Sequence, residues 1–61
     1  MSKKDYILLA EAFGLAVVDE GESAIRVAHR IVDALKQDNP RFQRTKFLAA
    51  IRARADYYQS L

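Results

Sequence analysis

Apolar residues recur at helical spacing along most of the chain, and two breaks divide this pattern into three segments. Gly21 and Pro40 each stand inside a short polar run, where both residue types interrupt helices. With an advance of about 100° per residue, apolar faces form in segments near residues 4–18, 23–37 and 43–59. The pattern therefore predicts an all-α, compact three-helix domain.

The first segment is apolar on nearly every side. Glu11 is the one charged residue between positions 6 and 18. This run is shorter than the roughly 20 apolar residues that a membrane-spanning helix needs. A helix that is apolar all round is normally buried all round, which is difficult in so small a protein. We expect one face to close the internal core, through Tyr6, Leu9, Phe13 and Val17.

The opposite side of this segment carries Leu8, Ala12 and Leu15, which the core does not need. We expect these three residues, together with Glu11, to form an interface with a partner. Two interpretations of Glu11 stay open: its carboxylate reaches solvent at the edge of the apolar run, or it pairs with an arginine of the partner.

The second segment has the alternation of an ordinary amphipathic surface helix, with Asp19 or Ser23 as its candidate N-cap. Its apolar side consists of Ala24, Ile25, Val27, Ala28, Ile31, Val32, Ala34 and Leu35. In the third segment one face is apolar, and it consists of Phe47, Leu48, Ile51, Ala55 and Tyr58. Three alanines outside that face, at 49, 50 and 53, indicate either helix propensity alone or a contact surface.

The turn around Pro40 is expected to be structural. Proline fixes its own φ and forces Asn39 toward extended backbone, while Asn39 can close an Asx turn. Phe42 is apolar in a polar stretch, so we expect it to fold back with Phe47 against Leu35. Asn39 or Thr45 is the candidate cap of the third helix, because glutamine at 43 caps poorly.

Length and composition favour association. The 61 residues allow one domain, residues 1–61, of 51% apolar and 30% charged composition. A chain of this size is marginally stable unless disulfides, metals or oligomerisation support it. The sequence has no cysteine and one histidine, so we expect no metal and no cofactor. Oligomerisation, most simply a homodimer, remains as the expected support.

Charge is divided unevenly along the chain. Residues 1–40 carry five Lys and Arg against seven Asp and Glu, a net −2, whereas residues 41–61 carry five against one, a net +4. A basic end can bind nucleic acid or an acidic protein, although it is also common on ordinary helices. The candidate contacts are Arg41, Arg44, Lys46, Arg52 and Arg54. They do not share one stripe of a helical wheel, so base readout is disfavoured.

Motifs of known enzymes are missing from the sequence. No nucleophile elbow, phosphate loop, dinucleotide fingerprint or zinc-protease spacing occurs. His29 and Asp33 share a helix face at i and i+4, a spacing that is typical of a solvated pair on a polar surface. We therefore expect no catalytic residues and a protein that is not an enzyme.

Two short stretches resemble a group of very small helical proteins encoded by bacteriophages and prophages. They are Lys3-Lys4-Asp5-Tyr6-Ile7-Leu8-Leu9-Ala10 and Asp38-Asn39-Pro40-Arg41-Phe42, the latter followed by Arg44, Lys46-Phe47-Leu48 and Ala50. The resemblance covers about residues 3–12 and 34–50, and most members of the group have no assigned function. The group usually has Asp where this chain has Gln43, and it usually ends soon after the Phe-Leu pair.

These observations together predict a phage-type accessory or inhibitor protein that acts by stoichiometric protein–protein binding. Its expected partner is a second copy, a bacterial host protein, or both. The alternative is a small helix-turn-helix-like regulator that binds nucleic acid through residues 41–54. Lys3 and Lys4 precede an apolar run as in a signal peptide, but Asp5, Glu11 and the lack of an Ala-x-Ala site disfavour that interpretation. We therefore expect a cytoplasmic protein of the bacterial host cell without membrane association.

Overall fold

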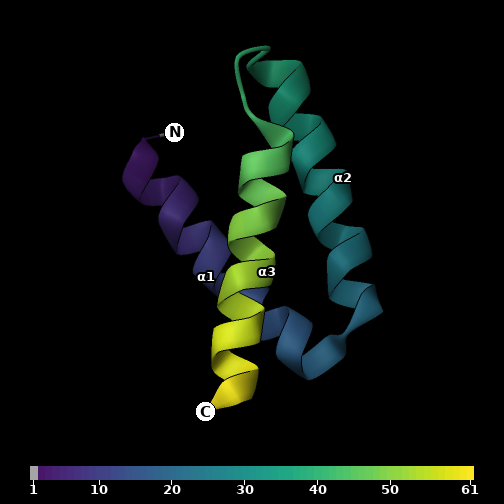
Figure 1. Ribbon diagram of the computed structural model, residues 1–61. Coiled ribbons are helices and arrows are strands. Elements are labelled where there is room, and N and C mark those ends of the chain that lie inside the picture. The colour runs from purple at the N-terminus through teal and green to yellow at the C-terminus, as the bar shows by residue number, and fades with distance from the viewer. Residues whose placement is uncertain (1) are drawn as a thin grey trace.

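Three helices make up the protein, as the computed structural model of residues 2–61 shows (Figure 1). They are α1 (Lys3–Glu20), α2 (Glu22–Asp38) and α3 (Arg44–Ser60). The prediction of an all-α fold with three helices is confirmed, and each predicted boundary lies within two residues of the observed one. α3 packs against both other helices, and more extensively against α1 than against α2.

The start of α1 is closed by a capping box. The Ser2 hydroxyl accepts the backbone N–H of Asp5 at 3.4 Å, and the Asp5 carboxylate accepts the backbone N–H of Ser2 at 3.0 Å. These bonds satisfy N–H groups at a helix start, where intrahelical partners are missing. Ser2 donates two hydrogen bonds to the Asp5 carboxylate, from its backbone N–H at 3.0 Å and from its hydroxyl at 3.2 Å. These bonds, the backbone one first, hold the pKa of Asp5 below its ordinary value of 3.8.

This lowered pKa predicts acid sensitivity of the first turn of α1. Because the folded pKa of Asp5 is depressed, the stabilisation is present above the ordinary pKa of 3.8 and is lost as pH falls through the folded value. In an NMR titration, the Ser2 amide signal should report a midpoint below 3.8. The Asp5→Asn variant should lose this pH dependence, and a midpoint at or above the ordinary value would contradict the prediction.

A single glycine joins α1 to α2. Gly21 has φ 65°, in the left-handed region, and donates its N–H to the Val17 carbonyl at 2.8 Å. Its own carbonyl accepts the N–H of Ala24 at 3.1 Å. The prediction that Asp19 or Ser23 caps α2 is wrong, because α1 continues through Glu20 and leaves one residue for the turn.

The loop between α2 and α3 is tied down by its own polar groups. The Asn39 side-chain oxygen accepts the Arg41 N–H at 3.1 Å, and the Asn39 carbonyl accepts the Phe42 N–H at 2.9 Å. Lys36 donates from Nζ to the Pro40 carbonyl at 2.6 Å and to the Phe42 carbonyl at 3.0 Å. The expected Asx turn is therefore confirmed, with a lysine tether that the sequence did not suggest.

The start of α3 has no side-chain cap. Gln43 precedes the helix and makes no capping hydrogen bond, and no acidic residue stands in the first turn. The prediction that Asn39 or Thr45 caps this helix is wrong. Asn39 instead ends α2, and Thr45 already lies inside α3.

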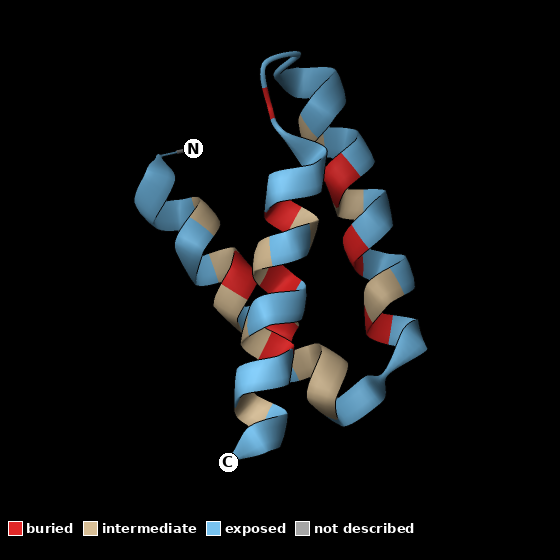
Figure 2. Ribbon diagram, viewed as in Figure 1, coloured by how far each residue is buried: buried red, intermediate tan, exposed pale blue. Residues whose placement is uncertain are grey.

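The core lies where the three helices face one another, and it is small (Figure 2). Its buried apolar residues are Ala10, Ala24, Ala28, Val32, Phe42, Phe47, Ile51 and Ala55, half of which are alanines. Partly buried side chains pack against the main cluster, namely Tyr6, Leu9, Phe13, Val17, Leu35, Leu48 and Ala50. The predicted core face of α1 and the plug formed by Phe42 and Phe47 are thus confirmed. Val27 and Ala34, expected on the apolar side of α2, lie exposed because a narrower stripe of α2 is covered.

α1 and α3 approach closely at Gly14, which is buried. A Cβ atom at this position would lie 2.7 Å from the Arg54 Cβ and 3.3 Å from the Ala55 backbone nitrogen. Only a residue without a side chain fits this distance. On the helical wheel, Gly14 lies between the two apolar faces of the first segment, so the sequence pattern did not reveal this role.

Candidate binding surfaces

One candidate surface is the outward face of α1, which we define as Leu8, Glu11, Ala12 and Leu15. Leu8 is 55% and Leu15 is 49% exposed, Ala12 is exposed and Glu11 is half-buried. Two leucines two turns apart on one face of a helix are spaced as in helix-to-helix contacts. The structure thus leaves three of the four predicted partner residues, Leu8, Ala12 and Leu15, exposed. Glu11 forms no ion pair among residues 2–61, so both interpretations of this residue stay open.

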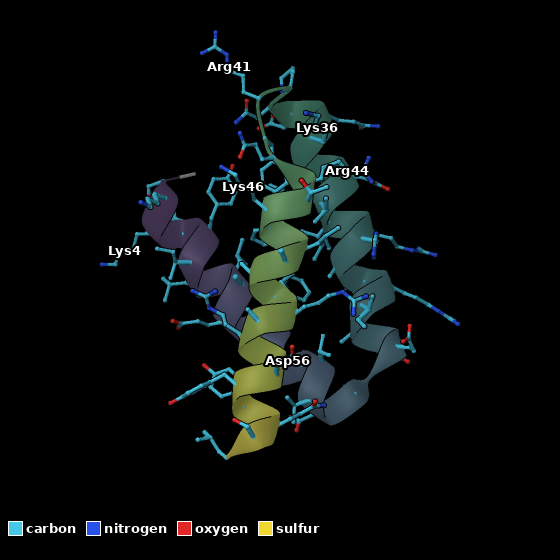
Figure 3. The ribbon with its side chains drawn as sticks, viewed as in Figure 1. Lys4, Lys36, Arg41, Arg44, Lys46 and Asp56 are labelled. Carbon is cyan, nitrogen blue, oxygen red and sulfur yellow. The ribbon has the colours of Figure 1, made fainter. Side chains whose placement is uncertain are left out.

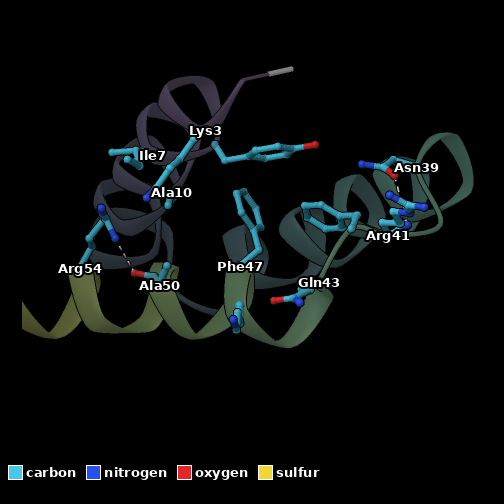
Figure 4. A pocket seen from close by; sticks show the side chains of 12 residues that line it. Lys3, Ile7, Ala10, Asn39, Arg41, Gln43, Phe47, Ala50 and Arg54 are labelled. Carbon is cyan, nitrogen blue, oxygen red and sulfur yellow. Dashed lines mark hydrogen bonds between the residues drawn. The ribbon is translucent and has the colours of Figure 1, made fainter.

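A second surface is a groove of about 410 Å³ between α1, the loop at residues 39–43 and α3 (Figure 4). Its apolar lining comes from Tyr6, Ile7, Ala10, Phe42, Phe47 and Ala50. Its basic lining comes from Lys3, Arg41, Lys46 and Arg54, and Asn39 and Gln43 complete it. We call this hollow the basic groove. No aspartate or glutamate of residues 2–61 lines it.

The aromatic cluster in this region joins all three contributing segments. The ring centroids of Tyr6 and Phe42 are 5.3 Å apart, those of Tyr6 and Phe47 are 6.1 Å apart, and those of Phe42 and Phe47 are 5.6 Å apart. Such distances suit tilted and edge-to-face packing. The cluster fixes the loop between α2 and α3 against the start of α1, so the groove has a rigid wall.

The structure separates the five basic residues that the sequence singled out. Arg41, Lys46 and Arg54 line the basic groove, where Lys3 joins them. The prediction that the five share no single helical stripe is not contradicted, because the groove gathers these residues from the loop and α3. A wheel drawn for one helix could not show the gathering, because Arg41 belongs to the loop.

The other two basic candidates lie elsewhere. Arg44 forms an ion pair with Asp33 of α2, with the two side chains 46% and 58% exposed, so this pair contributes less than about 1 kcal/mol. Arg52 lies with His29 at a smaller hollow of about 160 Å³ between α2 and α3. Arg41 and Lys46 appear near the loop end of the molecule in Figure 3, with Arg44 on the side of α2.

The pairing of Asp33 with Arg44 also revises the expected pair of His29 and Asp33. Asp33 uses its carboxylate across the helix interface, and the structure gives it no bond to His29.

Across the described residues 2–61, no three His, Cys, Asp or Glu side chains come together in a way that could hold a metal ion. Over the same residues, no helix is long and apolar enough to cross a membrane.

Comparison with protein-family models, with curated proteins and with solved structures gives no match for this chain. Inference about function therefore rests on the two surfaces themselves.

Proposed function

We propose that this protein is a non-catalytic binding module that acts by stoichiometric association. Its first partner is a second copy, bound through the outward face of α1 in a two-fold arrangement. A bacterial host protein is the further partner that we propose for the assembled module, in the manner of a phage accessory or inhibitor protein. In keeping with the resemblance in its sequence, we place it in the cytoplasm of the bacterial host.

One observation carries this proposal: more large apolar side chains are exposed than buried. Among residues 2–61, six are exposed, namely Ile7, Leu8, Leu15, Val27, Tyr57 and Leu61, against four buried, namely Val32, Phe42, Phe47 and Ile51. Val32 is the largest side chain that is completely buried. A domain with so small a core becomes more stable when further apolar surface is covered. Exposed apolar patches also commonly mark interaction sites.

The outward face of α1 is the part of this surface best suited to a two-fold contact. In such a contact the same patch is used on both copies, so one substitution enters the interface twice. We therefore expect Leu8→Glu or Leu15→Glu to abolish self-association while helix content stays largely intact. Sedimentation over a wide concentration range measures the first effect, and circular dichroism measures the second.

Val27→Glu provides the matched control, because Val27 is 51% exposed and lies on α2. This variant should associate like the unmodified protein. Dissociation by Val27→Glu with association retained in Leu8→Glu would place the interface on α2 and contradict the proposal. A monomer at every concentration would contradict self-association and leave a foreign protein as the partner of the same face.

A second candidate function is nucleic-acid binding, which the gathering of Arg41, Lys46 and Arg54 beside Lys3 favours. Binding of this kind weakens steeply with salt, because each neutralised phosphate releases counterions. A gel-shift assay with duplex and single-stranded DNA at low and moderate salt tests it. Absence of a shift at low salt would remove this candidate.

A further inference from the structure

We propose that the basic groove is a docking site for an acidic, amphipathic segment of another protein. The expected segment is a single helical turn or two that presents apolar side chains to the groove lining and carboxylates to its rim. This site lies on another side of α1 from Leu8, Ala12 and Leu15, and the two surfaces adjoin only at Ile7 and Glu11. On the wheel of α1, the groove residue Ala10 lies nearly opposite Ala12.

Charge supports an acidic occupant. Lys3 of α1, Arg41 of the loop, and Lys46 and Arg54 of α3 line one hollow that contains no carboxylate. Among residues 2–61, none of these four cations forms an ion pair, because the pair of Arg44 and Asp33 lies outside the groove. Arg54 donates a long hydrogen bond of 3.4 Å to the Ala50 carbonyl (Figure 4). Four cations from three segments along one hollow give it a positive rim, which is complementary in charge to a polyanionic partner.

The lining supports apolar anchors in the same ligand. Ile7 is 41% exposed, and Tyr6 and Ala50 are half-buried along the groove. The volume of about 410 Å³ falls within the range of ligand pockets and accommodates a few side chains. A mostly apolar hollow with a cationic rim suits an amphipathic segment better than a purely charged one.

The aromatic rings argue against a single-stranded nucleic acid as the occupant. Phe42 is 7% and Phe47 is 6% exposed, and their rings pack on one another and on Tyr6. Bases stack on free ring faces, which the two phenylalanines do not offer. The cations also surround a hollow instead of following a stripe that tracks a duplex backbone.

Fluorescence anisotropy with labelled synthetic peptides tests the site on the full chain. The probe is a helical peptide of about 15 residues, long enough to form helix on binding, with leucines on one face and glutamates elsewhere. There are two matched control peptides. One has lysine in place of every glutamate, and the other has serine in place of every leucine. A single-stranded oligonucleotide of equal charge is the fourth probe. The acidic leucine peptide should bind most tightly, and both replacements should weaken binding.

Charge-reversal variants locate the binding. Lys46→Glu or Arg41→Glu should weaken binding of the acidic peptide at least about tenfold, because the reversed charge lies inside the groove. Arg30→Glu makes the same change on the solvent side of α2, where screening by salt should limit the effect to less than about twofold. Leu15→Glu should bind the peptide normally, which separates this site from the proposed self-association.

Gln43→Asp distinguishes binding from stability. Aspartate at the N-cap of α3 should raise the melting temperature, because its carboxylate accepts a free N–H of the first turn. The same carboxylate lines the groove and should weaken peptide binding several-fold. A variant that is more stable yet binds worse cannot owe the loss to unfolding.

Three results would overturn the proposal. The first is equal binding of the acidic and lysine peptides. The second is an equal loss of acidic-peptide binding in the Lys46→Glu and Arg30→Glu variants. The third is tighter binding of the oligonucleotide than of the acidic peptide, which would assign the groove to nucleic acid.

Discussion

Phe42→Ala should lower the free energy of unfolding by about 3 kcal/mol or more, the usual cost of truncating a buried aromatic side chain. For a domain of 61 residues the total stability is expected to be about 3–9 kcal/mol. The variant should therefore lose at least about a third of its stability and unfold at a much lower temperature. Thermal and urea unfolding followed by circular dichroism measure the effect.

The size of this effect follows from what Phe42 holds together. Its ring contacts those of Tyr6 and Phe47, at centroid distances of 5.3 and 5.6 Å, and so links the loop to α1 and α3. Four of the eight buried apolar residues are alanines, which leaves few large side chains to compensate. A cavity at Phe42 removes a large share of the core at once.

Two variants control for this interpretation. Tyr57→Ala removes an aromatic ring that is 62% exposed and should cost little. Phe42→Leu keeps most of the apolar volume and should cost less than Phe42→Ala. A melting temperature unchanged by Phe42→Ala, or lowered equally by Tyr57→Ala, would contradict the role of Phe42 as a core plug.

The local features of the fold could be predicted because they depend on neighbours in the sequence. The break at Gly21 and the turn at Asn39 and Pro40 follow from backbone chemistry, and the structure confirms both. The buried faces of α1 and α3 follow from helical periodicity. The predicted caps of α2 and α3 are wrong. α1 continues through Glu20 and leaves Gly21 alone before α2, whereas Asn39 ends α2 and α3 begins only at Arg44.

The basic groove could not be predicted, because it depends on how the helices cross. Lys3 and Arg54 are far apart in the sequence, and a wheel for one helix shows no relation between them. The close approach at Gly14 explains the arrangement. It brings α1 against α3 near Arg54, and the N-terminal half of α1 then diverges from α3 (Figure 1).

α1 therefore has two separate roles on its two sides. Its buried side, with Ala10 and Gly14, sets the crossing with α3 and forms one wall of the basic groove. Its outward face carries Leu8 and Leu15, which are 55% and 49% exposed. The unusual apolar character of this helix is then explained by the core on one side and by the proposed interface on the other.

Gly14→Ala should destabilise the protein, although the same change stabilises an ordinary helix by about 1 kcal/mol. The added Cβ would lie 2.7 Å from the Arg54 Cβ, an atom fixed to the backbone, and 3.3 Å from the Ala55 nitrogen. Overpacking of this kind costs about 1–3 kcal/mol. Gly14→Leu should cost more, because the larger side chain forces α1 and α3 apart and opens the aromatic cluster beside the groove.

Urea unfolding of Gly14→Ala measures the net effect, and Ala53→Gly measures the helix-propensity term separately. Ala53 is exposed on α3, so its replacement reports the backbone cost of glycine without a packing term. Because Ala53→Gly is the reverse change, the sum of the two losses in unfolding free energy gives the cost of the steric contact at the crossing. A Gly14→Ala protein that is more stable than the unmodified chain would show that α1 and α3 can separate at no cost. Gly14 would then not set the crossing angle that forms the groove.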